Sequence, residues 1–170
     1  DNPINSLASG TMLQVIVFAL IVGVILAKVL GYEFIDTDLV IQHREKRLLR
    51  EIIADEGNEG FLAIENEVNA TLEADKSVIA PGGSAIYGKE AMEHFKEIGT
   101  IVYLKLSYED LAKRLGNLKG RGVVLKEGQT LKDLYDERSK LYEQYAEITV
   151  DESGKDIQGT ILALREQIGM

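Results

Sequence analysis

Residues 12–38 read MLQVIVFALIVGVILAKVLGYEFIDTD, and this stretch decides the fold. It begins with a long apolar run, passes through Gly31, and ends in the β-type segment EFI with Asp36 and Asp38 after it. Open α/β sheets bind their ligands at the carboxyl ends of their strands. The two carboxylates stand at such an end, so the sequence predicts that chemistry or ligand binding takes place there.

The apolar run Val15–Ala27 is thirteen residues long and has no polar side chain. As a helix it would extend about 20 Å, which is short of the roughly 30 Å hydrocarbon core of a bilayer. It also lacks the basic residues that precede the core of a signal peptide. We therefore expect a buried core segment, with a strand at 14–18 and a helix that continues to Leu30 and is capped by Gly31. A membrane span is disfavoured.

Composition limits the classes of protein to which the chain can belong. Its 170 residues, 45% of them apolar, fit one domain over residues 12–170, after a flexible polar leader at 1–11. The net charge of −9 argues against broad nucleic-acid binding. The chain has no cysteine, and His43 and His94 are isolated, which disfavours disulfides and metal ligation by histidine. A reducing cytoplasm is the expected location.

Strand and helix patterns alternate along the rest of the chain. Strands are expected at 32–38, 77–80, 100–106 and 148–150, and helices after residue 39, at 90–96, after Ser107, at 131–145 and at 157–168. Gly57 and Gly60 should divide the helical pattern that follows residue 39 into shorter pieces. The alternation predicts a three-layer α/β fold, a mostly parallel sheet covered by helices on both faces.

Two places directly after strands are candidates for ligand binding. Asp36 and Asp38 follow the first of them, although Asp38 also precedes a helix, so N-terminal capping is an equally good interpretation. Gly82 and Gly83 follow another, and paired glycines let a ligand approach the backbone N–H groups. A tight strand-to-helix turn is the plainer explanation of the glycine pair.

Two sets of basic residues are candidates for anion binding. The segment Lys113–Lys126 carries five basic residues and no acid, and its glycines suit a lid that closes over a multiply charged anion. Arg138 lies in a helical pattern, where its guanidinium could clamp a carboxylate. A solvated loop and a surface ion pair are the respective alternatives.

Taken together, these pieces resemble the shikimate kinase family of P-loop kinases, over about residues 26–168. The resemblance rests on LAKVLGYEFIDTD, the glycine pair, RLGNLKGR, and the helix with LYDER and LYEQYAE. It implies a five-stranded parallel sheet flanked by helices, a substrate-binding insert at about 48–72, and a lid at about 116–128. It also implies a monomer that transfers phosphate from ATP, with Mg²⁺, to the 3-hydroxyl of shikimate.

The resemblance assigns roles to individual residues. Asp38 would hold the shikimate hydroxyl and help to remove its proton, and Asp36 would assist the magnesium shell. Gly82 and Gly83 would contact shikimate through their backbone. Three arginines would hold charged groups: Arg121 in the lid at the phosphates, Arg114 on the nucleotide side, and Arg138 on the shikimate carboxylate.

The chain departs from the family pattern where the phosphate-binding loop G-x-x-G-x-G-K-[ST] belongs. Its glycine positions fall on Leu13, Ile16 and Phe18, its lysine on Ala19, and its Ser/Thr on Leu20. Further departures place Leu62 at a carboxylate-binding arginine, Ser84 at a third glycine and Lys140 at a proline.

Apolar residues supply neither the turn nor the cation and hydroxyl that ATP phosphates require. We therefore predict a shikimate-kinase-like chain with impaired catalysis. The alternatives are a non-catalytic binding or structural relative, and a membrane-associated protein that uses residues 15–27.

Overall fold

The computed structural model describes residues 12–115 and 129–169. The chain forms two compact units. Unit 1 comprises Asp1–Val22, Val102–Gln144 and Ile148–Met170, and unit 2 comprises Gly23–Ile101 with Tyr145–Glu147. The expected leader at 1–11 and the expected lid at 116–128 lie outside the described residues.

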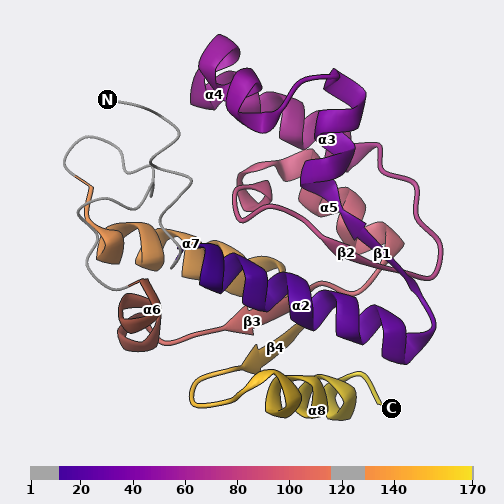
Figure 1. Ribbon diagram of the computed structural model, residues 1–170, viewed down its shortest axis with the longest axis vertical. Coiled ribbons are helices and arrows are strands. Elements are labelled where there is room, and N and C mark those ends of the chain that lie inside the picture. The colour runs from indigo at the N-terminus through magenta and orange to yellow at the C-terminus, as the bar shows by residue number, and fades with distance from the viewer. Residues whose placement is uncertain (1–11, 116–128, 170) are drawn as a thin grey trace. The chain divides into compact units, whose positions relative to one another are not determined.

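Unit 2 is built around a parallel pair of strands (Figure 1). Strand β1 (Glu33–Asp36) pairs with β2 (Ser77–Ala80), so that Asp36 lies opposite Ala80. The connection between them runs through helices α3 (Thr37–Glu45) and α4 (Leu49–Ala70). After β2 come the short 3₁₀ helix η1 (Ala85–Tyr87) and helix α5 (Lys89–Ile98). Because the strands are parallel, the segments that follow them leave from the same edge of the sheet.

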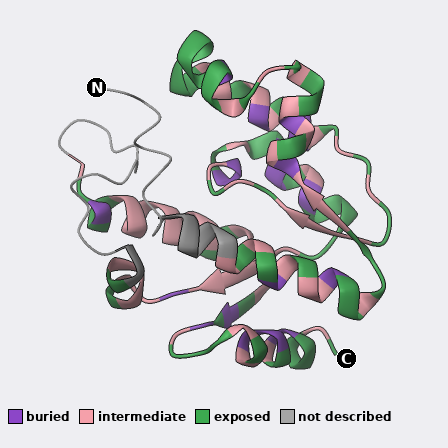
Figure 2. Cartoon of the chain, viewed as in Figure 1, coloured by how far each residue is buried: buried purple, intermediate pink, exposed green. Residues whose placement is uncertain are grey.

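The core of unit 2 lies between α3 and α4. Ile41, Ile52 and Val68 are buried there, and Val40, Leu49, Phe61 and Ile64 pack against them. Helix α5 adds a buried stripe of Ala91, Met92 and Phe95, with the spacing of one helix face. Figure 2 shows the first half of α4 as largely exposed, so its one fully buried side chain, Ile52, anchors it.

Helix α4 is bent at Gly57, where φ is 71° and ψ is −177°. This conformation is open almost only to glycine, so the break that the sequence predicts here is confirmed and follows from the residue type. Gly60, the second expected break, stays helical.

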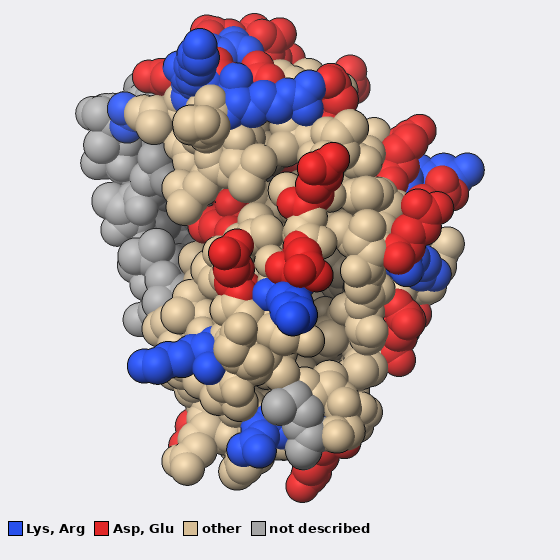
Figure 3. All heavy atoms as spheres, turned by 90° about the vertical axis from the view of Figure 1, so that its right-hand side faces the viewer, with Lys and Arg blue, Asp and Glu red and all other residues tan. Residues whose placement is uncertain are grey.

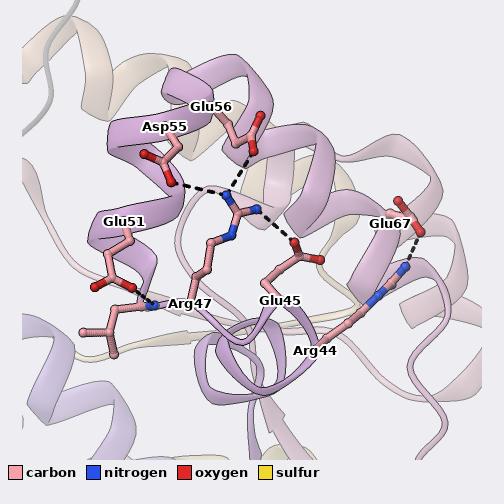
Figure 4. Close-up of polar contacts among 8 residues, drawn as sticks. Arg44, Glu45, Arg47, Glu51, Asp55, Glu56 and Glu67 are labelled. Atoms are coloured by element: carbon pink, nitrogen blue, oxygen red, sulfur yellow. Dashed lines mark hydrogen bonds and ion pairs between the residues drawn. The ribbon is translucent and has the colours of Figure 1, made fainter.

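Arg47 ties the α3–α4 connection to the first half of α4 (Figure 4). Its guanidinium contacts Glu45 at 3.1 Å, Glu56 at 3.0 Å and Asp55 at 3.5 Å. Nearby, Arg44 pairs with Glu67. Figure 3 shows the same mixture on the surface, with basic side chains interspersed among acidic ones at the end of unit 2 that α3 and α4 form.

Unit 1 contains a second parallel pair, β3 (Val102–Lys105) with β4 (Ile148–Asp151). Its other described elements are α6 (Tyr108–Leu115), α7 (Leu131–Tyr145) and α8 (Ile157–Gln167). The Tyr135 hydroxyl on α7 donates to the carbonyl of Leu106 at 3.0 Å, which holds α7 to the end of β3. Ser107 caps α6 through the backbone N–H of Asp110, at 3.1 Å, as the sequence predicts.

The α/β class with parallel strand pairing is confirmed, but the expected single sheet of five strands is not found. The described residues form four strands in two sheets of two. The strand expected at 14–18 is wrong, because these residues belong to helix α2 (Met12–Leu30). No glycine or proline stands between Gln14 and Gly23 to divide a strand from a helix, so the apolar run forms one helix.

Helix α2 ends as the sequence predicts. Gly31 has a φ of +68°, and the N–H of Tyr32 donates to the carbonyl of Ala27 at 2.9 Å, so the last turn is closed by a glycine in the left-handed region. Burial is less complete than expected, since Val22 and Ala27 are buried whereas Ile21 and Val24 are exposed. Among the described residues, no helix is both long and apolar enough for a membrane span.

Candidate functional site

The candidate site lies where β1 gives way to α3. Asp36 is the N-terminal cap of α3, and its Oδ1 accepts a hydrogen bond from the backbone N–H of Asp38 at 3.0 Å. The capping function that the sequence allowed for Asp38 therefore belongs to Asp36. Asp38 lies in the first turn of the helix, where the N-terminal end of the helix dipole favours a negative charge.

The side chain of Asp38 is nevertheless partly buried, and burial disfavours its charged form. Burial raises its pKa above the ordinary value, and the neighbouring charge of Asp36 adds to the effect. A carboxyl with a raised pKa at the carboxyl end of a strand is typical of ligand-binding and catalytic sites, although ion-pair networks produce the same shift.

Gly82 brings the loop after β2 against this carboxylate. A Cβ at position 82 would lie 3.2 Å from Oδ1 of Asp38 and 2.8 Å from Oε1 of Glu65. The first distance is tight and the second is too short for a real contact, so a side chain here would displace one or both acids. Glycine at position 82 thus lets the backbone of the loop lie close to both carboxylates. The approach of a ligand to this backbone, which the sequence predicted, stays a prediction.

Glu65 is a site residue that the sequence analysis missed. It lies on α4, is 1% exposed, and its Oε1 accepts a hydrogen bond from the Ser84 hydroxyl at 3.0 Å. The sequence does indicate that Glu65 is buried, because it lies on the same helix face as the apolar residues Phe61, Ile64 and Val68. An acid at such a position is buried and needs hydrogen-bond donors.

The structure brings Asp36, Asp38 and Gly82 together and adds Glu65 and Ser84, with Gly83 in the chain between the two loop residues. The parallel register of β1 and β2 is the reason, since residues 36–38 and 82–84 follow paired strand ends.

The three predicted arginines belong to unit 1, whereas Asp38 and Gly82 belong to unit 2. Arg138 lies half-buried on α7 in unit 1, and its place beside a substrate stays a prediction. Arg114 lies on α6, and its side chain is not among those described. Arg121 lies outside the described residues.

The described residues Ala19 and Leu20 do not fit the phosphates of a nucleotide. Along α2, Ala19 and Leu20 occupy the positions at which the family pattern has a lysine and a hydroxyl, so neither a cation nor a magnesium ligand is supplied there. Within the described ranges, no three side chains of the His, Cys, Asp or Glu types gather as a metal site.

A family model described as shikimate kinase matches residues 21–168, which is most of the chain. The chain belongs to the shikimate kinase family. Curated relatives named shikimate kinase 2 include that of Yersinia enterocolitica, 33% identical over 139 residues, which cover 76% of this chain and 78% of the relative. That of Yersinia pseudotuberculosis is 32% identical over the same shares.

Solved structures of the shikimate kinase family share the fold. The enzyme from Aquifex aeolicus superposes with a TM-score of 0.70 at 27% identity, covering 87% of this chain and 88% of its own. The enzyme from Acinetobacter baumannii, solved in complex with shikimate, has a TM-score of 0.66 at 30% identity, covering 94% and 84%. Members of the family use ATP and Mg²⁺.

Proposed function

We propose that this chain binds shikimate at the Asp38 site and transfers phosphate to it at a rate near background. The observation that carries the proposal is the half-buried Asp38, with its raised pKa, packed against Gly82 at the ends of two parallel strands. Family membership supports shikimate as the ligand, and one similar structure holds it.

In this proposal Asp38 accepts a hydrogen bond from a ring hydroxyl of shikimate. Gly82 and Gly83 contact the ligand through their backbone, since glycine has no side chain to cover its peptide groups. Arg138 clamps the shikimate carboxylate by a paired hydrogen bond. A magnesium role for Asp36 would use the lone pairs that its hydrogen bond with the Asp38 N–H leaves over.

The slow phosphate transfer follows from the missing groups that would bind the phosphates of ATP. A P-loop holds phosphates by backbone N–H groups, a lysine and a hydroxyl, and removing one contact of this kind from a transition-state site costs roughly 100- to 1000-fold in rate. The family match begins at residue 21, directly after Ala19 and Leu20, where the lysine and hydroxyl are absent. Arg114 and Arg121 can still attract phosphates, so nucleotide binding should be weak and sensitive to salt.

The test measures shikimate binding and phosphate transfer separately. Calorimetric titration with shikimate should show saturable binding, and D38N should weaken it about tenfold or more, because it removes the charge from a hydrogen-bonded acceptor. D75N is the matched control, since Asp75 is exposed and lies before β2. A coupled assay with shikimate, ATP and Mg²⁺, at low and high salt, should show no turnover above a protein-free blank.

The binding of shikimate and the low rate of phosphate transfer can each be contradicted separately. Saturable turnover with a normal rate would show that another group replaces the P-loop. The absence of shikimate binding, or equal binding by D38N and D75N, would remove Asp38 from the role assigned to it.

A further inference from the structure

Ser84 makes a contact that the proposed function does not use. Its hydroxyl donates to Oε1 of Glu65 at 3.0 Å and thereby joins the loop after β2 to helix α4. Glu65 is 1% exposed, so water cannot replace a lost donor easily. Removing one partner of a buried hydrogen bond leaves the other unsatisfied, which costs free energy.

Two carboxyl oxygens lie beside one glycine of this loop. Oε1 of Glu65 and Oδ1 of Asp38 both lie next to the position that a Cβ of Gly82 would occupy, at 2.8 and 3.2 Å. One comes from α4 and the other from the β1–α3 junction. Two hydrogen-bond acceptors from different helices thus lie next to the backbone of Gly82.

We propose that Ser84 is a positioning residue of the ligand site, whose hydroxyl fixes Glu65 beside Asp38 so that the site recognises two hydroxyls of one ligand. This inference rests on the proposed function, because it concerns the same site. It adds a specificity element, since Asp38 alone provides one carboxylate and the Ser84–Glu65 pair provides a second in a fixed place.

The residue at position 62 makes the hydroxyls of the ligand more important for its affinity. Leu62 stands three residues before Glu65 on α4, and residues at this spacing share a helix face. A leucine cannot bind a carboxylate, so the hydroxyl side of the ligand contributes a larger share of the affinity. A site built to bind hydroxyls rejects analogues that lack them, because its buried polar groups then stay unpaired.

The experiment compares S84A and S84T with wild type. S77A is the matched control, because the Ser77 hydroxyl also makes a hydrogen bond, to the Asp75 carbonyl at 2.8 Å, but on the exposed start of β2. Dissociation constants are measured by competition NMR for shikimate, for its methyl ester, which keeps the hydroxyls, and for cyclohexene-1-carboxylate, which has none. Thermal melting of every variant verifies folding.

We expect S84A to weaken the binding of shikimate and of its methyl ester by about fivefold or more, as the loss of one buried hydrogen bond predicts. Binding of the hydroxyl-free acid should change less than twofold, and S84T should recover most of the loss. A comparable loss for all three ligands would mean that Ser84 only supports the fold, and would overturn the inference. So would equal affinities in S84A and S77A.

Failure of the proposed function and failure of S84A to fold give results that differ from those above. If the wild-type protein binds neither shikimate nor its ester, the proposed function itself fails, and this inference with it. If S84A does not fold, E65Q takes its place, because glutamine still accepts from Ser84 but replaces the second carboxyl oxygen by an amide group that only donates. The same selective loss for the two hydroxylated ligands is then expected, and unchanged affinity would contradict the inference.

Discussion

At the scale of single residues, Asp36 and Asp38 show how two similar side chains acquire different roles. Asp36 is bound to the backbone of α3, whereas Asp38 faces Gly82 and is partly withdrawn from water. Burial first, and the charge of Asp36 second, raise the pKa of Asp38. A group held in an unfavourable ionised state reduces stability, and proteins retain such groups at functional sites.

We predict that D38N stabilises the protein at neutral pH. The unfolded chain keeps the ordinary pKa, so the raised value in the folded state favours folding at low pH, and this contribution is lost as pH rises through the raised pKa. Asparagine does not titrate, so the melting temperature of D38N should rise relative to that of wild type as pH rises. We expect the difference in Tm to be about 2–4 °C at pH 7. Thermal melts from pH 4 to 8 measure the difference.

D75N provides the comparison, because it also removes one acid but at an exposed position. Its melting temperature should follow that of wild type across the pH range. If D38N falls below wild type at pH 7, the Asp38 carboxylate stabilises the fold and is not a strained functional group.

At the scale of elements, the sequence predicted most of what lies after residue 30, because turn residues and apolar spacing mark those helices and strands locally. It failed at the start of α2, because the apolar residues between Gln14 and Gly23 fit a strand and a helix equally well. It also missed Glu65, because the contact with Ser84 links residues that are 19 positions apart. Such pairing becomes visible only when the sheet and helix are assembled.

The kink in α4 gives a prediction for an element. Gly57 adopts a φ of 71° with a ψ of −177°, which costs a residue with a side chain about 1–3 kcal/mol. We expect G57A to lower the free energy of unfolding by that amount, measured by urea denaturation. G99A is the control, because Gly99 has an extended φ of −172° and open space where its Cβ would be; it should change stability little.

The opposite outcome for G57A is also informative. If alanine straightens the helix, stability stays equal and circular dichroism shows added helix content. The kink would then be a consequence of glycine alone, and neither the core at Ile52 nor the Arg47 contacts would require it.

At the scale of the whole molecule, we propose that the chain keeps the family fold without the family's nucleotide site. The match over residues 21–168 and the shared fold come from spacing and packing across the chain, which tolerate many substitutions. Phosphate binding depends on a few residues in one loop, and the net charge of −9 does not favour a polyanion. A chain can therefore keep the shikimate kinase fold and the Asp38 site while the nucleotide site is lost.

This separation predicts a gain of function. The variant L13G/I16G/F18G/A19K/L20S restores G-x-x-G-x-G-K-S at the positions that the family pattern assigns. If the loop is the principal defect, shikimate phosphorylation by ATP should rise about 100-fold or more above the wild-type background, since the lysine and the backbone donors act on the transition state. Adding L62R should then lower KM for shikimate by supplying a carboxylate partner.

The matched control omits A19K and keeps the other four changes, so that it has the flexible loop without the cation. It should bind phosphates poorly and stay within about tenfold of background, because the glycines alone leave the charge on the phosphates uncompensated. Equal activity in the control and the full variant would assign the recovery to loop flexibility. A folded full variant without activity would mean that the defect extends beyond residues 13–20, and the separation of fold from nucleotide site argued here would be wrong.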